Sequence, residues 1–382
     1  MRLLSYLQSA AVILQSYDGS IPFSSWLKSY FREHKKFGSK DRKMIADLCF
    51  CFYRLGGLLA NETIEKRLLV GQFLCHSQSP FLEEFQQDWL TSTDAPIERK
   101  VKAIDGADLS SIFPFTQALS KEIDGDSFAA SHLTQPDLFL RLRPGQEKNV
   151  MQKLAAASLP FSIENACIRL PNNSKVDEVI ELDKEAVVQD KSSQKVLDNL
   201  QHQTQSIKLQ TFWDCCAASG GKTILLHDLF PKAQITVSDI RESILHNLRN
   251  RLKRAGIRNF QSFVADISSP SFSSTKQYDV ILCDAPCSGS GTWGRTPEQL
   301  YFFKKEKIDH YADLQKRIAV NAGKYVKKGG YFVYITCSVF AKENEEVVTH
   351  LLQNTSLQLV EQQYMKGYTE KADTLFSALF QL

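Results

Sequence analysis

Two cysteines occur where their residue type could carry nucleophilic chemistry. Cys287 follows the apolar run 278–283, and Cys337 follows the apolar run 330–335. Runs of this length, bounded by polar or turn residues, are typical of strands that are covered on both faces. In an open α/β sheet, the residues that do chemistry gather at the carboxyl ends of the strands. The sequence therefore predicts that both thiols and the Asp284 carboxylate lie at one edge of a sheet.

A glycine-rich segment, residues 214–223, could hold a ligand against the start of a helix. It reads Asp-Cys-Cys-Ala-Ala-Ser-Gly-Gly-Lys-Thr. Small residues allow a ligand to approach the backbone closely, and a helix N-terminus offers free N–H groups. A phosphate-binding P-loop has a glycine five positions before its Gly-Lys pair. Here that position is Cys216, so the segment does not predict ATP or GTP binding.

Aspartates end several of the predicted strands. Asp239 ends the strand that follows the glycine-rich segment, and Asp266 and Asp284 end the next two. In dinucleotide-binding folds, an acidic residue at such a position accepts hydrogen bonds from ribose hydroxyls. The three strand-end aspartates therefore favour a cofactor that contains a nucleoside. No phosphate cradle rich in arginine or glycine accompanies them, which favours S-adenosylmethionine over NAD or a nucleoside triphosphate.

Two thiols beside a carboxylate match the needs of one reaction, the methylation of cytosine at carbon-5. That carbon is too weakly nucleophilic to take a methyl group unaided, but a thiolate that adds to carbon-6 activates it. A carboxylic acid can contact N3 and the amino group, and a further group must assist removal of the carbon-5 proton. A free cysteine has a pKa of about 8.5, so the nucleophile also needs an electropositive, partly exposed niche.

The order of the predicted elements places this chemistry in the last of three domains. Residues 1–134 show helical apolar spacing, residues 135–192 form short strands around a helix, and residues 193–382 alternate strands and helices. We therefore expect the α/β fold class, with a doubly wound and mainly parallel sheet, preceded by a small α/β module and a helical domain. The predicted strands of the main sheet are 211–214, 234–239, 260–266, 278–284 and 330–336.

The composition is that of an ordinary globular protein and excludes several other classes. The 382 residues are 43% apolar and 23% charged, with a net charge of +3. There is no apolar run of the ~18 residues that a membrane span needs, and the N-terminus is too polar for a secretory signal. The nine cysteines show no C-x-x-C spacing, so we predict neither disulfides nor a metal site. We expect a cytoplasmic monomer that does not bind membranes.

Basic and aromatic residues offer candidate contacts to nucleic acid. The segments 32–43 and 249–254 are compact and basic, as phosphate-binding surfaces are. Trp293 and Tyr301 could stack on bases, and Arg295 could contact a base or a phosphate. Solvated helix faces and core packing are the alternative readings of these residues.

The motifs described above resemble the signature loops of the RsmB/Sun-type RNA cytosine-5 methyltransferases. Asp-Ala-Pro-Cys at 284–287 and Thr-Cys-Ser at 336–338 are specific signals, whereas the loop 217–223 is a more general one. The resemblance covers about residues 138–382. Further matching stretches are 187–190, 327–330 and 343–347. The resemblance implies a Rossmann-like class I methyltransferase core, S-adenosylmethionine as cofactor, and RNA as substrate, with ribosomal RNA as the first choice.

By position, the resemblance also implies catalytic roles. Cys337 would be the nucleophile, and Cys287 would assist release of the methylated base. Asp284 would hold the cytosine edge, with Lys222 near the cofactor carboxylate and the reacting centre.

The implied cofactor site lies in the strand-end loops. Asp239 would bind the cofactor ribose and Asp266 its adenine, while the glycine-rich loop would line the methionine part. The full implied set is Cys216, Ala217, Ala218, Ser219, Gly220, Gly221, Lys222, Asp239, Arg241, Asp266 and Asp284.

Two departures and three alternatives accompany the resemblance. The family usually has proline where this chain has Ser219, and residues 1–134 are similar to a NusB-like domain mainly through 39–43. Residues 135–192 would be a ferredoxin- or RRM-like module that binds RNA. The alternatives are a tRNA methyltransferase, a DNA methyltransferase in which Cys287 attacks, and a non-catalytic RNA-binding factor of ribosome assembly.

Overall fold

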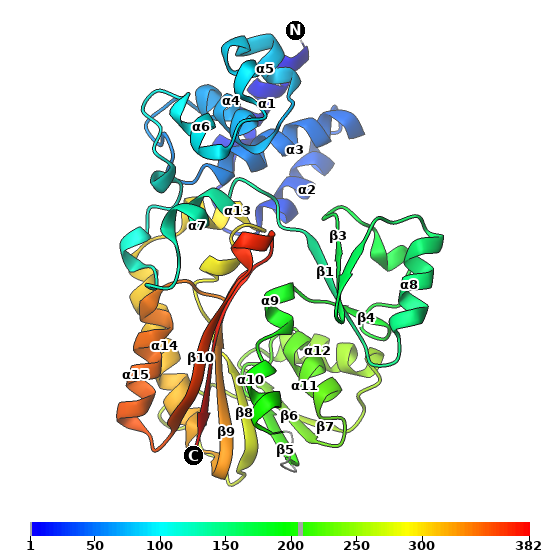
Figure 1. The fold of residues 1–382 in the computed structure, drawn as a ribbon, viewed down its shortest axis with the longest axis vertical. Helices are drawn as coiled ribbons and strands as arrows, with labels where there is room; N and C mark the ends of the chain where they lie inside the picture. Colours follow the sequence, from blue (N-terminus) through cyan, green and yellow to red (C-terminus); the bar gives the residue numbers. More distant parts are fainter. Residues whose placement is uncertain (1, 205–208) are drawn as a thin grey trace. The chain divides into compact units, whose positions relative to one another are not determined.

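The computed structural model describes residues 2–204 and 209–382, and the chain divides into two compact units. One unit comprises Met1–Gln135 with Thr292–Lys305, and the other comprises Pro136–Gly291 with Glu306–Leu382 (Figure 1). The first unit thus takes in a segment from the second half of the chain. The predicted domains 1–134, 135–192 and 193–382 stay predictions, because compactness does not test whether a segment folds alone.

The first unit is helical because its apolar residues recur at helical spacing and are buried together. Ile45, Leu48 and Phe52 of α3 are buried in its core. None of the described helices in either unit is long and apolar enough to cross a membrane. The α-helices of this unit are α1 (Arg2–Ser16), α2 (Phe23–Glu33), α3 (Ser39–Arg54), α4 (Ile64–Cys75), α5 (Pro80–Phe85), α6 (Ile97–Lys102), α7 (Gly125–Ser131) and α13 (Pro297–Phe302).

The segment that carries α13 is bound into the helical unit by its backbone and by its rings. The buried Arg54 guanidinium donates to the Gly294 carbonyl at 3.0 Å. Trp293 is 1% exposed, and its ring lies 5.9 Å from that of Phe113 between centroids. The stacking role considered for Trp293 is therefore wrong, because its indole is enclosed by the unit's own core. The ring of Tyr301 stays 44% exposed.

The second unit begins with a small antiparallel sheet in the order β2-β3-β1-β4. The helix α8 (Glu147–Ala156) packs on it through Val150 and Leu154. Arg141 and Arg143 both pair with the buried Asp228, at 2.5 and 2.9 Å, which joins this sheet to the following helical layer. The strands are β1 (Leu138–Leu142), β2 (Ser162–Glu164), β3 (Cys167–Leu170) and β4 (Ala186–Val188).

The main sheet has seven described strands in the order β10-β11-β9-β8-β5-β6-β7. Strands β9, β8, β5, β6 and β7 are parallel, while β11 pairs antiparallel with both β9 and β10. The predicted α/β fold with a mainly parallel sheet is thus confirmed. The strands are β5 (Thr211–Asp214), β6 (Gln234–Asp239), β7 (Phe260–Val264), β8 (Tyr278–Asp284), β9 (Val326–Thr336), β10 (Gln358–Lys366) and β11 (Thr374–Gln381).

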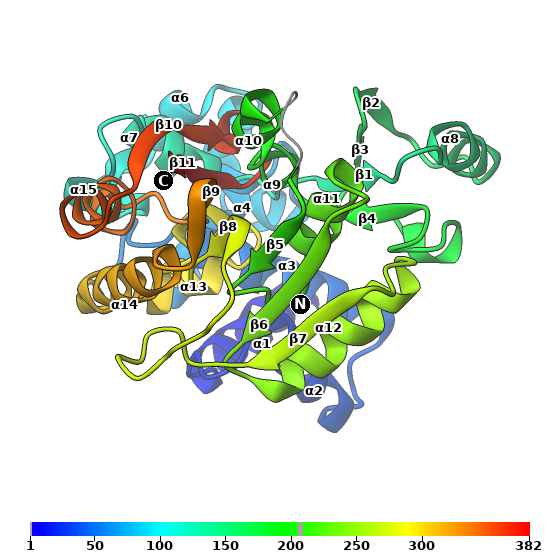
Figure 2. The ribbon, with the colours of Figure 1, turned by 90° about the horizontal axis from the view of Figure 1, so that it is seen from below.

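Helices cover both faces of this sheet, so its central strands β8 and β9 are mostly apolar and buried. The helices α14 (Glu306–Gly323) and α15 (Glu345–Asn354) pack side by side on the face that carries Trp213 and Phe332 (Figure 2). The opposite face, which carries Phe212, is covered by α10 and α11. Its helices are α9 (Lys191–Gln194), α10 (Asp198–Gln203), α11 (Gly221–Leu229) and α12 (Glu242–Arg254).

Candidate active site

The two motif cysteines meet at the carboxyl edge of the main sheet. Strands β8 and β9 are parallel neighbours, with Asp284 opposite Ile335, so the loops that follow them leave the sheet side by side. The Sγ atoms of Cys287 and Cys337 lie 3.3 Å apart, and both residues are half-buried. The predicted convergence of two thiols at one strand-end edge is therefore what the structure contains.

The two thiols are held as neighbours by the backbone of their loops. The Gly291 N–H donates to the Cys337 carbonyl at 2.9 Å. A Cβ on Gly291 would lie 2.0 Å from the Thr374 carbonyl oxygen, so only glycine allows the loop to pass this close to β11. The hydrogen bond to Cys337, together with burial, raises the pKa of the Cys287 thiol well above its ordinary value.

A buried carboxyl group beneath the thiols ties the two loops together, and it was not among the predicted site residues. Glu343 is fully buried; its Oε2 accepts from the Ser288 N–H at 2.9 Å and from Gln315 Nε2 at 2.8 Å. Its Oε1 accepts from Ser338 Oγ at 3.0 Å. Burial raises the pKa of Glu343, although these hydrogen bonds oppose the shift. The available sequence signal was the position of Glu343 in the matching stretch 343–347.

The predicted acid of the site is paired with the lysine of the glycine-rich loop. Lys222 Nζ donates to Asp284 Oδ2 at 2.7 Å, and both side chains are mostly enclosed. Burial by itself would lower the pKa of Lys222, but the charge of Asp284 and that of Cys337 leave this pKa raised. A fixed ammonium therefore stands between the carboxylate and the thiol, as an electropositive niche requires.

The glycine-rich loop between β5 and α11 is held in an open turn. The Ala217 N–H donates to the Ser238 carbonyl at 3.0 Å, and the Ala218 N–H donates to Asp239 Oδ2 at 3.2 Å. Gly220 has φ +83°, in the left-handed region, and a Cβ there would lie 2.1 Å from a methyl carbon of Leu248. Glycine is thus required at this turn. Cys216, Ser219 and Gly221 lie in the same segment.

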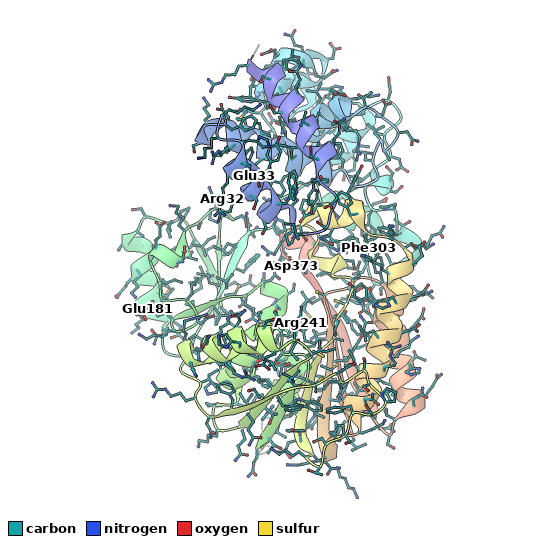
Figure 3. The ribbon with its side chains drawn as sticks, turned by 180° about the vertical axis from the view of Figure 1, so that it is seen from behind. Arg32, Glu33, Glu181, Arg241, Phe303 and Asp373 are labelled. Carbon is teal, nitrogen blue, oxygen red and sulfur yellow. The ribbon has the colours of Figure 1, made fainter. Side chains whose placement is uncertain are left out.

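Two of the three predicted cofactor-binding aspartates, Asp239 and Asp284, lie at strand ends. Asp239 ends β6 and is buried, and its Oδ1 accepts from the Arg241 N–H at 3.0 Å and from Arg241 Nε at 3.3 Å. The side chain of Arg241 is labelled in Figure 3. Asp266 was predicted to end the third strand, but β7 ends at Val264. The chain turns away after Ala265, whose N–H donates to the Asp239 carbonyl, and Asp266 Oδ1 instead accepts from Ser268 within the loop.

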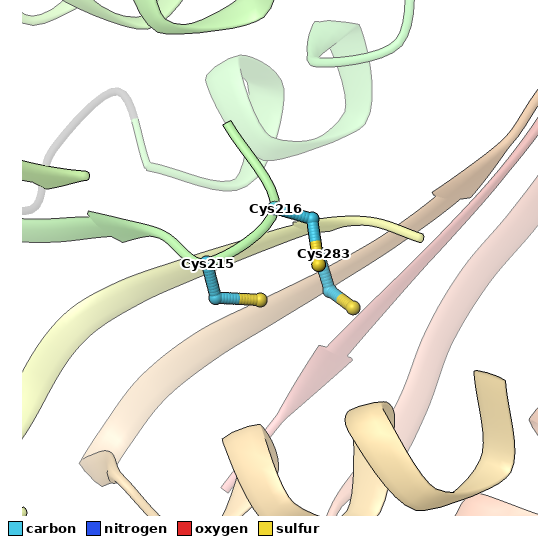
Figure 4. Close-up of side chains that lie close together, drawn as sticks. All are labelled: Cys215, Cys216 and Cys283. Carbon is cyan, nitrogen blue, oxygen red and sulfur yellow. The ribbon is translucent and has the colours of Figure 1, made fainter. Parts of the chain in front are cut away.

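Three further thiols gather beneath the glycine-rich loop. Cys215 and Cys283 are buried and Cys216 is half-buried, and their Sγ atoms all lie within 4.8 Å of one another (Figure 4). Next to them, Asp214 is 1% exposed and accepts from Thr223 Oγ1 at 2.6 Å. Burial raises the pKa of Asp214 to about 7. Cys215 and Cys283 belong to the core cluster of the main sheet, so they are packing residues.

The predicted basic segment 249–254 is largely neutralised by ion pairs. Arg251 and Arg254 both pair with Asp183, at 2.7 and 3.0 Å, and Arg249 pairs with Glu242 at 2.7 Å. Arg251 also donates to the Ser219 carbonyl, so this helix supports the glycine-rich loop. Its availability to phosphates is correspondingly reduced. In the other segment, the basic residues Arg32, Lys35, Lys36, Lys40 and Lys43 are exposed.

The fold and this edge define a class, the Rossmann-like methyltransferases. The strand order with antiparallel β11 beside β9, and a glycine-rich turn after β5, are the features that place the chain there. Within that class, residues 201–376 match the family described as 16S rRNA methyltransferase RsmB/F. The match covers a little under half of the chain, which is therefore similar to the RsmB/F family over these residues.

Relatives of known name match a little under half of the chain. It is 34% identical over 169 residues to ribosomal RNA small subunit methyltransferase B of Enterobacter sp. (strain 638), which covers 44% of this chain and 39% of that protein. The same-named protein of Proteus mirabilis (strain HI4320) is 32% identical over 167 residues, with the same coverage, 44% and 39%. The match thus spans about two fifths of each relative.

Solved structures support the fold over a longer stretch. The protein PH0851 has a TM-score of 0.70 at 19% identity and covers 97% of both chains. A methyltransferase homologue from Pyrococcus horikoshii has a TM-score of 0.58 at 22% identity, covering 72% of this chain and 94% of that one. NSun6 from Pyrococcus horikoshii, solved with SFG, has a TM-score of 0.57 at 15% identity, covering 68% and 96%.

Proposed function

We propose that this protein is an S-adenosylmethionine-dependent RNA methyltransferase that makes 5-methylcytosine in ribosomal RNA. The observation that carries the proposal is the pair of thiols, 3.3 Å apart, beside the Lys222–Asp284 ion pair. The match of residues 201–376 to the family described as 16S rRNA methyltransferase RsmB/F supports ribosomal RNA as the substrate. The relatives' name, ribosomal RNA small subunit methyltransferase B, supports it further.

The glycine-rich loop and the strand-end aspartates fit S-adenosylmethionine. The turn at Gly220 would admit the methionine part, and the Asp239 carboxylate would accept from the ribose hydroxyls. Arg241 and Asp266 would flank the nucleoside, with Asp266 toward the adenine. The relative NSun6 was solved with SFG, an analogue of this cofactor. When bound, S-adenosylmethionine would supply an electrophilic methyl group.

The chain's own residues would carry the remaining steps. The Cys337 thiolate would form a bond to carbon-6 of cytosine, and the electron pair of the 5,6 double bond would make carbon-5 nucleophilic. Asp284 would contact the N3 and amino edge, with Lys222 fixing its orientation. After methylation, loss of the carbon-5 proton would return that electron pair and break the bond to Cys337. Cys287 lies beside this sulfur and would assist the proton's removal.

The target base must be unpaired or turned out of its helix to reach the thiols, as for other enzymes that act on a base. RNA would be held by surfaces outside the main sheet. The exposed basic residues of segment 32–43 offer phosphate contacts, and the exposed ring of Tyr301 offers a stacking surface.

The direct test combines S-adenosylmethionine carrying a labelled methyl group with undermethylated ribosomal RNA. Wild type, Cys337→Ala and Cys287→Ala are compared, with Cys215→Ala as the matched control from the buried thiol cluster. We expect labelled 5-methylcytosine from wild type and Cys215→Ala, none from Cys337→Ala, and a trapped covalent RNA adduct with Cys287→Ala.

Other outcomes would change the proposal in defined ways. If Cys337→Ala kept full activity and Cys287→Ala lost it, Cys287 would be the nucleophile, as in the DNA-type arrangement. Methylation of tRNA or DNA in preference to ribosomal RNA would overturn the substrate. RNA binding by wild type without methyl transfer to any RNA pool would instead favour a binding factor.

A further inference from the structure

A second group of potential ligands lies in the helical unit, where α3 meets the end of α4. Asp47 and Cys51 are four residues apart in α3 and therefore share one face of that helix. Cys75 is the last residue of α4, and His76 follows it as the C-cap. We call these four residues the α3–α4 cluster. No motif spacing in the sequence predicts this cluster, because each helix contributes only two of its residues.

The backbones of the two helices touch beside the cluster. A Cβ on Gly71 of α4 would lie 2.9 Å from both the backbone carbon and the carbonyl oxygen of Cys51. The glycine therefore allows a contact that no larger residue would permit, and it carries the last turn of α4 against α3. The positions of the four side chains follow from the packing of two helices rather than from flexible surface segments.

Three of the donor atoms converge on one point. His76 Nε2 lies 3.0 Å from Asp47 Oδ2 and 3.4 Å from Cys51 Sγ, and Cys51 Sγ lies 4.0 Å from Asp47 Oδ2. Ligands at about 2.0–2.3 Å from one tetrahedral ion are about 3–4 Å apart. The thiols of Cys75 and Cys51 are close enough for each to shift the pKa of the other, but the donor atoms that all lie within 4.8 Å of one another are those of Asp47, Cys51 and His76.

The geometry argues against a nucleophilic cysteine as the explanation. In a catalytic triad the histidine uses one ring nitrogen for the nucleophile and the other for the carboxylate. Here the Asp47 carboxylate and the Cys51 thiol both face the same nitrogen, Nε2 of His76. Several donors around one shared point are the arrangement that a cation needs.

The surroundings orient the donors. Gln72 Nε2 donates to Asp47 Oδ2 at 2.8 Å, and Gln72 Oε1 accepts from the buried Ser79 Oγ at 2.8 Å. Such outer partners fix a ligand's orientation. One thiolate and one carboxylate around a divalent ion leave no net charge, so the site needs no further charged partner.

We propose that the α3–α4 cluster binds a divalent metal ion, with Zn²⁺ as the ion that its mixed sulfur, nitrogen and oxygen donors fit best. The side chains of Asp47 and His76 are 43% and 36% exposed, so an ion can reach the cluster from solvent. Cys51 is buried and forms its floor. The ion joins α3 to α4, and it stands apart from the proposed methyl transfer.

The test uses Co²⁺ as a spectroscopic substitute for Zn²⁺ on the full chain, reduced and freed of metal with a chelator. We expect one Co²⁺ per chain, with the sulfur-to-cobalt absorption of a thiolate site, and displacement by one Zn²⁺. Zn²⁺ should also raise the thermal midpoint, because it binds only the folded state. In Cys51→Ser and in His76→Gln, Kd for Zn²⁺ should rise at least about tenfold, the least that loss of even an outer partner causes.

Two controls locate the ion. Cys49→Ala changes a buried thiol two residues away in α3, and Cys283→Ala changes the other thiol group, so both should keep wild-type affinity. If Cys51→Ser does not fold, Asp47→Asn is measured in its place, because Asp47 is partly exposed. Absence of stoichiometric binding, wild-type affinity in both ligand variants, or loss of binding in Cys283→Ala would each overturn the proposal.

Discussion

The strands β5 and β8 are parallel neighbours that both end in an aspartate with cysteines beside it, but their surroundings differ. At the end of β5, Asp214 and Cys215 are each 1% exposed, and the carboxyl group contacts a threonine hydroxyl. At the end of β8, Asp284 is paired with a lysine, and the half-buried Cys287 faces a second thiol.

The difference shows that residue type and strand position alone do not make a reactive group. Burial without a charged partner keeps the Asp214 carboxyl group neutral up to about pH 7. The ammonium of Lys222, which comes from the loop after β5, serves the end of β8 instead. One strand end therefore packs against the glycine-rich loop, and the other places a lysine ammonium beside a carboxylate and a pair of thiols.

The largest contrast should appear in the alkylation of the native protein. We expect iodoacetamide to modify the half-buried Cys337 under native conditions, and to modify Cys287 more slowly because the pKa of its thiol is raised. Cys215 and Cys283 should react at least about 10³-fold more slowly than Cys337, because a buried thiol reacts only after the structure opens. Mass spectrometry of timed samples measures each site. Equal rates at Cys215 and Cys337 would remove the contrast between the two strand ends.

The second contrast concerns the dependence of stability on pH. Folding raises the pKa of Asp214 from 3.8 to about 7, so its contribution to stability is complete below pH 3.8 and is lost as the pH rises through about 7. This loss amounts to about 4 kcal/mol. In Asp214→Asn the side chain stays neutral, and the loss should vanish.

Urea unfolding of wild type and Asp214→Asn at pH 4 and pH 8 measures the effect. Among the described residues, Asp214 Oδ1 has no hydrogen-bond partner, so the amide should bring a penalty of about 1–3 kcal/mol at both pH values. The free energy of unfolding of the variant minus that of wild type should therefore be larger at pH 8 than at pH 4. A stability difference that does not change with pH would show that the carboxyl group titrates as in the unfolded chain.

The sequence predicted the main sheet well where strands are buried on both faces. The bounds of β5, β6 and β8 are those expected, since continuous apolar runs between polar turns leave a clear signal. The C-terminal pair was not predicted: β10 is an edge strand whose residues are mostly exposed and polar. Nor could the sequence show that Thr292–Lys305 joins the helical unit, because that depends on contacts with residues far away in the chain.

The candidate site likewise has features that the sequence predicted and features that it did not. The thiols and Asp284 were predictable, because motifs at strand ends carry their own local signal. Lys222 and Asp284, which form an ion pair, are 62 positions apart in the sequence. Glu343 accepts a hydrogen bond from Ser288, which is 55 positions away. The α3–α4 cluster likewise required the packing of two helices. Local spacing cannot specify such contacts; only the fold does.

The third contrast tests the two aspartates in catalysis. Asp284→Asn removes the charge that pairs with Lys222. On the proposed mechanism, kcat/KM for methyl transfer should fall about 10²–10³-fold, as when one preorganised electrostatic group is lost. Asp214→Asn should cost less than about tenfold, since its carboxyl group is sealed from the reacting edge. A comparable loss in both variants would mean that the two strand ends act as one site.

The last and smallest contrast concerns the glycines that shape the two loops. At Gly291, beside β8, a methyl group would meet the Thr374 carbonyl oxygen at 2.0 Å, and backbone cannot move aside easily. Gly291→Ala should lower the free energy of unfolding by up to about 3 kcal/mol. At Gly220, beside β5, the nearest atom is the movable side chain of Leu248. Gly220→Ala should therefore lose only the left-handed backbone preference, about 1–2 kcal/mol.

Urea unfolding compares these variants with Gly125→Ala, where the new methyl group makes only an ordinary contact at 3.6 Å and alanine favours the helix. Gly125→Ala should unfold at the wild-type urea concentration or above. Gly291→Ala should also slow methyl transfer, since the same backbone N–H holds the Cys337 carbonyl. A larger loss of stability in Gly220→Ala than in Gly291→Ala would mean that the glycine-rich loop after β5 is more tightly constrained than the loops that carry the two thiols.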